Sequence, residues 1–149
     1  MSARPCLERP APDHEEKAVT LLLPITLTTA SVLALLGMVI SIRAALTRGK
    51  TGILIGDGGN HDLIVRMRTH ANFVEYVPLL LVFMGLLELA GVSRTLLMAS
   101  AGLLVIARVL HAVGMAGKQP NLLRAAGTVG TTVVTAVYIV CGLMQVFAH

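Results

Sequence analysis

Four long apolar stretches constrain the fold of this chain more than any other feature of its sequence. They span residues 19–43, 63–89, 95–115 and 122–148, and the second becomes apolar only after Tyr76. An α-helix rises about 1.5 Å per residue, so roughly 20 apolar residues cross the ~30 Å hydrocarbon core of a bilayer. The sequence therefore predicts an all-α integral membrane protein whose four helices cross the bilayer.

The composition agrees with a membrane location. Of the 149 residues, 55% are hydrophobic and 13% are charged, and the mean hydropathy is +0.79. A soluble domain of this length could not cover its surface with so few charges. The net charge is +4, but the basic residues are scattered between apolar runs and form no stripe. This pattern argues against a nucleic-acid partner and favours membrane lipid.

The chain divides into a short tail and one transmembrane domain. Residues 1–17 are polar and rich in proline, so we expect a disordered tail that is not a cleaved signal. Residues 18–149 form the predicted four-span domain. The cysteines at positions 6 and 141 form no CxxC pair and the histidines are dispersed, so no metal site is predicted.

The links between the apolar stretches predict the topology. Residues 91–93 and 117–121 are short links, which force neighbouring helices to run antiparallel in an up-down bundle. The longer link 47–62 carries GDGGN, interpreted as a surface turn, with Asp62 as the expected cap of the second helix and Ser93 of the third. Lysine and arginine concentrate around the first and third links, so the positive-inside rule predicts that this end faces the cytoplasm.

The second apolar stretch begins with the polar segment RMRTHANFVEYVP, residues 66–78. Arg68, Asn72, Glu75 and Tyr76 are spaced so that they share one face of a helix, on an arc of about 100°. An ionised carboxylate inside a bilayer costs several kcal/mol unless it is paired, so arginine partners are expected for Glu75. The alternative is a structural ion-pair network that only fixes the helix register.

Pro78 follows this segment within the same predicted helix. Proline removes one backbone donor, which favours a kink beside the polar face.

Further cationic side chains are expected at the same depth of the membrane. They are Arg43 at the end of the first stretch, Arg108 and His111 in the third, and Arg124 in the fourth. One carboxylate cannot neutralise them all, and excess positive charge below an apolar region suits an anionic ligand with an apolar partner. The alternatives are that Arg43 and Arg124 extend to the interface and that His111 is a hydrogen-bonded packing residue.

The string Arg68-x-x-x-Asn72-x-x-Glu75-Tyr76-x-Pro78, within a four-span protein, resembles the MAPEG family, the membrane-associated proteins in eicosanoid and glutathione metabolism. The sequence from VISIRAAL through GDGGN to the basic third stretch is similar to that of the bacterial branch of the family. The resemblance covers residues 19–148. It implies a homotrimer of four-helix protomers in the bacterial inner membrane. Glutathione, as co-substrate, would bind between subunits toward the cytoplasm.

The resemblance also implies roles for individual residues. Glutathione would be bound by Arg68, Asn72, Glu75 and Tyr76, by Arg43, and by His111 on the third helix. Arg124, at the start of the fourth helix, would stabilise the glutathione thiolate. The third helix of the eicosanoid enzymes carries two ligand-contacting tyrosines, where this chain has His111 and Met115.

The implied function is a glutathione-dependent transferase or peroxidase acting on small hydrophobic electrophiles or lipid hydroperoxides. The alternative is a non-catalytic membrane binding or scaffold protein of the same fold, which the loss of the tyrosines favours.

Overall fold

The computed structural model describes residues 22–118 and 120–147. They form α1 (Pro24–Thr51), α2 (His61–Leu89), α3 (Arg94–Ala116) and α4 (Leu122–Phe147), with no strand in these ranges. All four helices are long and apolar enough to cross a membrane, so the predicted all-α, multi-pass architecture is confirmed. The predicted tail, residues 1–17, lies outside the described residues.

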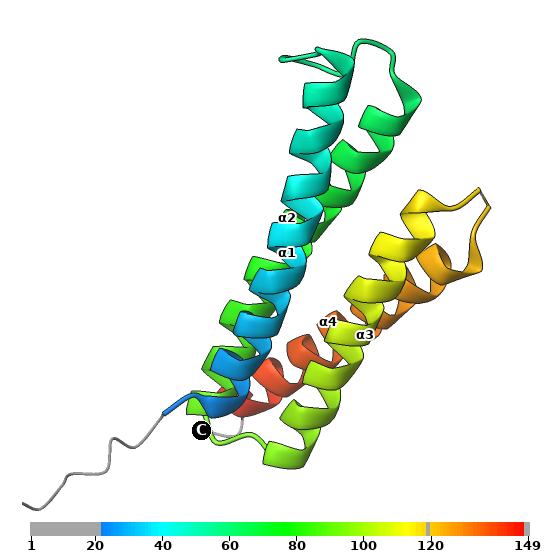
Figure 1. Ribbon diagram of the computed structural model, residues 1–149. Helices are drawn as coiled ribbons and strands as arrows, with labels where there is room; N and C mark the ends of the chain where they lie inside the picture. The colour runs from blue at the N-terminus through cyan, green and yellow to red at the C-terminus, as the bar shows by residue number, and fades with distance from the viewer. Residues whose placement is uncertain (1–21, 119, 148–149) are drawn as a thin grey trace, which may run out of the picture.

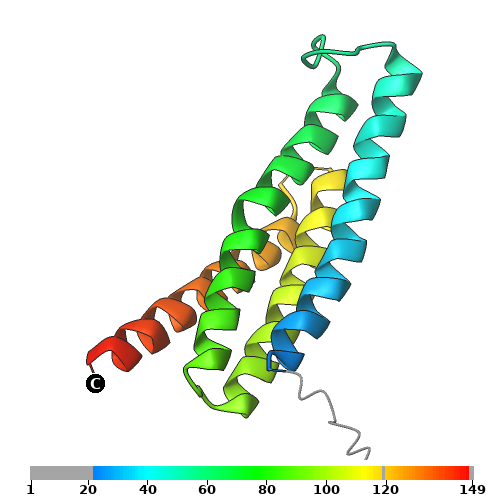
Figure 2. The same cartoon turned by 90° about the vertical axis from the view of Figure 1, so that its left-hand side faces the viewer.

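The helices run alternately up and down as two antiparallel hairpins (Figure 1). The hairpin of α1 with α2 packs against the hairpin of α3 with α4, because α3 contacts both α1 and α2. At the end that carries the first and third links, α1 and α2 extend beyond α3 and α4 (Figure 2). The C-terminal half of α4 diverges from the other helices, as the same view shows.

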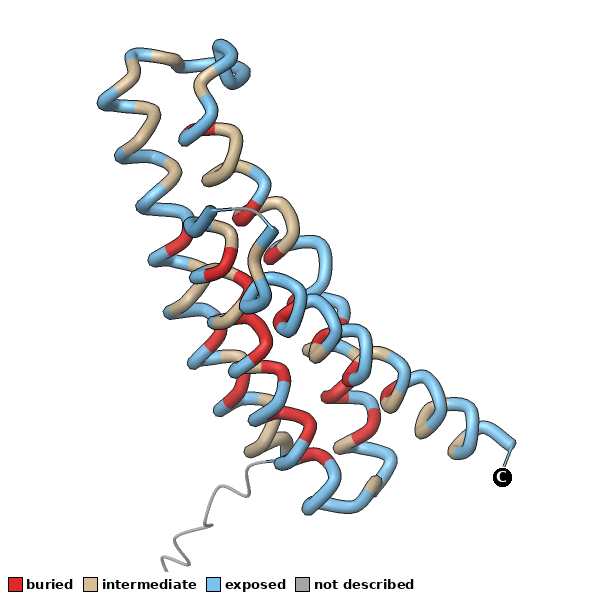
Figure 3. Tube along the Cα trace, turned by 90° about the vertical axis from the view of Figure 1, so that its right-hand side faces the viewer, coloured by how far each residue is buried: buried red, intermediate tan, exposed pale blue. Residues whose placement is uncertain are grey.

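The core lies in the middle of the bundle, where the buried positions of the helices face one another (Figure 3). Leu33, Met84, Leu104 and Tyr138, one from each helix, are fully enclosed. The Tyr138 hydroxyl lies 3.1 Å from Oγ of Ser100, so this buried polar group has a partner. Large apolar side chains cover the outer faces of the helices instead, as expected where lipid replaces water.

The first helix is longer than predicted, because it continues past Arg43 to Thr51. Its end is held by Arg48, whose Nη1 donates to the carbonyls of Ile53, Leu54 and Gly56 at 3.2, 3.2 and 3.0 Å. The backbone N–H of Gly52, at φ 70°, closes the last turn on the Arg48 carbonyl. Helices commonly end at a glycine in the left-handed conformation. The pattern of apolar residues alone did not reveal this end of α1.

The predicted cap of the second helix is wrong. Asn60 is the N-cap, and its Oδ1 accepts from the backbone N–H of Leu63 at 3.0 Å. Asp62 lies in the first turn and forms an ion pair with Arg66 at 3.5 Å. Ser93 occupies the cap position of α3 as predicted, but its side chain makes no capping hydrogen bond within the described chain.

A carboxylate from α2 caps the first helix. Glu88 accepts from the backbone N–H groups of Ile25 and Thr26 at 2.9 and 2.8 Å, and from the Thr26 hydroxyl at 2.7 Å. The residue at the N-cap of α1, Leu23, offers no side-chain acceptor. Negative charge at a helix N-terminus is favourable because the first backbone N–H groups lack partners there. Glu88 therefore ties the start of α1 to the end of α2.

We expect Glu88→Ala to lower stability by about 1–2 kcal/mol, because it leaves the first N–H groups of α1 without an acceptor. Glu88→Gln should lose less, since it keeps one oxygen. Thermal unfolding followed by circular dichroism in detergent measures both. An unfolding temperature of Glu88→Ala equal to that of the wild type would contradict the capping role.

Candidate functional site

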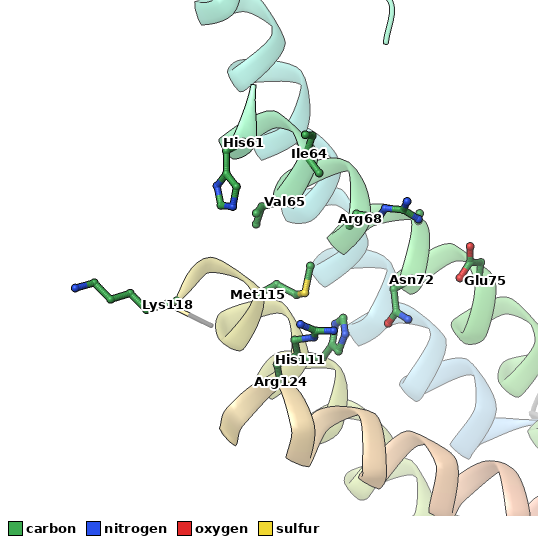
Figure 4. Close-up of a pocket in the computed structure, with 12 residues that line it drawn as sticks. His61, Ile64, Val65, Arg68, Asn72, Glu75, His111, Met115, Lys118 and Arg124 are labelled. Carbon is green, nitrogen blue, oxygen red and sulfur yellow. The ribbon is translucent and has the colours of Figure 1, made fainter. Parts of the chain in front are cut away.

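A cavity of about 680 Å³ lies at the end of the bundle that carries the links α1–α2 and α3–α4. Its walls come from α2, α3, the link that follows α3, and the start of α4 (Figure 4). The lining includes the predicted site residues Arg68, Asn72, Glu75, His111 and Arg124. The volume falls within the range of small-molecule sites, and the positive-inside rule predicts that this end faces the cytoplasm.

One wall of the cavity is the polar face of α2. Arg68, Asn72 and Glu75 line it along consecutive turns, because their spacing keeps them on one side of the helix. Tyr76 does not line the cavity; its ring lies 5.8 Å from the guanidinium carbon of Arg108. Pro78 lies inside α2, which continues beyond it to Leu89.

Glu75 has no ion pair within the described chain, and its side chain is exposed. The arginine partner expected from the sequence is therefore not supplied by the described part of the same chain. Arg66, an arginine of the same helix, pairs with Asp62 instead. Since Glu75 lies in a membrane-spanning helix, a single subunit leaves this carboxylate on its outer surface.

Arg108 contacts the polar face of α2, although it is not among the glutathione-binding residues expected from the sequence. Its side chain is only 2% exposed, and Nη1 donates to Oδ1 of Asn72 at 3.0 Å. Nη2 donates to the Gly127 carbonyl at 3.4 Å and to the Thr131 hydroxyl. An arginine within an apolar helix needs polar partners, and that signal was visible in the sequence. Its partners lie on α2 and α4, so spacing alone could not identify them.

Close packing of α3 on α4 positions His111 and Arg124. A Cβ on Gly127 would lie 2.5 Å from the backbone nitrogen of His111 and 2.6 Å from the carbonyl of Ala107. A Cβ on Gly114 would collide with the backbone of Arg124. These two glycines therefore let the helix backbones approach, as small residues do in membrane proteins. As a result, the His111 and Arg124 side chains lie next to each other (Figure 4).

The structure does not bring all predicted residues together in one chain. Arg43 lines a separate small pocket with Ile40, Arg66, Thr69 and Ala112, and it does not line the larger cavity. Conversely, His61 and Lys118 line the cavity without having been predicted. In the described part of the chain, no group of His, Cys, Asp and Glu side chains is arranged to hold a metal ion.

Comparison with known proteins agrees with the four-helix membrane architecture. The family model of the MAPEG family matches residues 26–144. The chain belongs to the MAPEG family. It is 32% identical over 81 residues to the inner membrane protein YecN of Escherichia coli K12 and, equally, to YecN of Escherichia coli O6:H1.

These MAPEG alignments cover 54% of the chain and 62% of each relative, which is less than two thirds of the relative's length. The relatives' inner-membrane location agrees with the one expected for this chain. No solved structure matches significantly.

In this MAPEG protein we expect Gly127→Ala to destabilise the fold by about 1–3 kcal/mol, because the new methyl group overpacks the α3–α4 contact. Gly102→Ala is the matched control: it lies on α3 and a Cβ there meets nothing within 4 Å. The control should be neutral or stabilising, since alanine favours helices. Unfolding temperatures by circular dichroism in detergent compare the two, and equal temperatures would contradict the packing argument.

Proposed function

We propose that the chain is a glutathione-dependent transferase or peroxidase that acts on hydrophobic electrophiles or lipid hydroperoxides. The charge pattern of the cavity carries this proposal. Arg68, Lys118 and Arg124 supply positive charge around it, and Glu75 supplies one negative charge. Glutathione has the complementary pattern of two carboxylates and one ammonium group. Arginine binds carboxylates in a bidentate manner, and a carboxylate suits an ammonium group.

Arg124 is the group we assign to thiol activation. A thiolate, not a thiol, is the reactive nucleophile, and a nearby guanidinium favours the charged form. The thiolate sulfur would attack the electrophilic carbon and form a thioether, while the leaving group departs with the bonding electron pair. With a lipid hydroperoxide it would attack the terminal oxygen, giving an alcohol and a sulfenic acid. A second glutathione would convert that acid to the disulfide and water.

The apolar co-substrate would arrive through the membrane. Ile64, Val65 and Met115 contribute apolar surface to the same cavity that holds the charged groups. The four helices expose large apolar side chains toward lipid. A hydrophobic molecule dissolved in the bilayer therefore has a short path to the proposed thiolate. Membership in the MAPEG family supports this arrangement.

We also propose that the active form is a homotrimer. Glu75 and Tyr76 are exposed on the single chain although they lie in a membrane-spanning helix. Leaving an ionised carboxylate against lipid costs several kcal/mol, so burial against another copy is favourable. A neighbouring copy could also bring its own Arg43 to the cavity, which accounts for the separation of Arg43 from Arg68 within one chain.

A non-catalytic binding protein of the same fold is the second candidate. His111 and Met115 line the cavity at the positions where the resemblance to the eicosanoid enzymes implies two tyrosines. The loss of these hydroxyl groups favours binding without turnover.

We expect the protein purified in detergent to conjugate glutathione to 1-chloro-2,4-dinitrobenzene above the uncatalysed rate. Arg124→Ala should lower kcat by roughly 100-fold, because stabilisation of the thiolate is lost, whereas Arg68→Ala should mainly raise KM. Arg94→Ala is the control, since Arg94 begins α3 at the opposite end of the bundle.

A protein with no rate above background and no glutathione-dependent thermal shift would refute the proposal. Binding of glutathione without turnover would select the second candidate.

We expect native mass spectrometry in detergent to detect a trimer of the 15.7 kDa chain. Glu75→Ala should weaken the trimer, because an interfacial carboxylate loses its partners in the neighbouring copy. Glu88→Gln, at the other end of α2, is the control and should remain trimeric. A monomeric wild-type protein, or a trimer unaffected by Glu75→Ala, would contradict the role given to Glu75.

A further inference from the structure

A buried guanidinium lies directly behind the polar wall of the cavity. Arg108 does not itself line the cavity, and its recorded hydrogen-bond partners are neutral: the Asn72 amide, the Gly127 carbonyl and the Thr131 hydroxyl. In the described ranges it has no carboxylate partner, and its Nε has no hydrogen-bond acceptor. The positive charge is therefore uncompensated by any carboxylate of the described residues. Such a charge inside a membrane protein favours an anion nearby.

The hydrogen bond between Arg108 and Asn72 has only one possible direction. A guanidinium carries five N–H donors and no acceptor, so the Asn72 atom that faces Nη1 at 3.0 Å must be the carbonyl oxygen. The Thr131 hydroxyl cannot reverse the network, because it donates to the Gly127 carbonyl at 2.9 Å and accepts from Arg108. The hydrogen bond from Arg108 thus fixes the orientation of the Asn72 amide.

The nitrogen end of the amide is the part that Arg108 leaves without a partner. Asn72 is half-buried and lines the cavity, and its side chain projects from α2 toward α3 and α4 (Figure 4). Its Nδ2 makes no hydrogen bond to another described residue. Two N–H donors at the cavity wall are therefore available to a ligand, next to the buried positive charge of Arg108.

We infer that Arg108 is a positioning residue that makes Asn72 a donor-only contact for an anionic hydrogen-bond acceptor of the ligand. If the asparagine amide could rotate freely, it could offer its oxygen as readily as its nitrogen. It would then not distinguish a hydrogen-bond acceptor of the ligand from a donor. With its oxygen held by Arg108, it selects acceptors over donors. This inference rests on the proposed function, in which the acceptor is a carboxylate of glutathione.

Asn72→Asp separates this role from a purely structural one. The variant gives Arg108 a carboxylate partner, so the ligand-free unfolding temperature should rise by about 3 °C or more. It also removes both N–H donors and places negative charge at the wall, so glutathione affinity should fall roughly 100-fold. If the contact between Arg108 and residue 72 were only structural, Asn72→Asp would raise the unfolding temperature and leave the glutathione affinity unchanged. Isothermal titration calorimetry and circular dichroism in detergent give the two readouts.

Two further variants test the positioning role. Arg108→Lys keeps a donor for the Asn72 oxygen and should retain most of the affinity. Arg108→Gln can accept as well as donate, so the amide of Asn72 is free to turn, and the affinity should fall about 10-fold. Ser100→Ala is the matched control, because Ser100 lies on the same helix as Arg108 and the change removes its buried hydrogen bond to Tyr138 of α4. It should lower the unfolding temperature and leave glutathione affinity unchanged.

The outcomes distinguish the inference from the proposed function. If the wild type binds glutathione and Asn72→Asp binds it equally well, or unfolds at a lower temperature, the inference is overturned and the function stands. If the wild type does not bind glutathione, the proposed function fails. The inference then depends on inorganic pyrophosphate as the probe. The inference is supported if pyrophosphate raises the unfolding temperature of the wild type but not that of Asn72→Asp. It is overturned if pyrophosphate raises the unfolding temperature of neither protein.

Discussion

The cost of placing a charge in a membrane underlies the organisation of this protein. Lipid offers no hydrogen bonds, so each charged group within a spanning helix needs partners from other helices or from another subunit. Arg108 of α3 finds such partners on α2 and α4, which joins three helices at the inner wall of the cavity. Glu75 finds no ion-pair partner in the described chain. The contacts of Arg108 order the wall of the site, and the unpaired state of Glu75 in the described chain supports the proposed homotrimer.

The two ends of the bundle are held in different ways. At one end, the carboxylate of Glu88 binds the first N–H groups of α1 and fixes the helices to each other. At the other end, the close contact at Gly127 brings α3 against α4, and the cavity lies beside this contact with the polar face of α2 as one wall. Rigid packing next to an open volume is what a binding site requires, because the groups that contact a ligand need fixed positions.

Charged and apolar groups share one cavity, which suits a reaction between a polar thiol peptide and a membrane-soluble partner. Arg68, Arg124 and Glu75 provide the charge pattern, while Ile64 and Met115 provide apolar surface. The donor-only amide at Asn72 would add selectivity for one charged end of the peptide. In this scheme the membrane delivers one substrate, and the protein's charges select and orient the other.

The sequence by itself determined the four spans, their antiparallel order, and the shared face of Arg68, Asn72 and Glu75, because length, link size and helical periodicity are local properties. Only the tertiary structure decided which side chains meet between helices. The contact of Arg108 with Asn72, the cap that Glu88 gives to α1, and the separation of Arg43 from the cavity each join or divide residues far apart in the chain. Spacing along one helix carries no information about the rotation of its neighbour, so these contacts depend on how the helices pack.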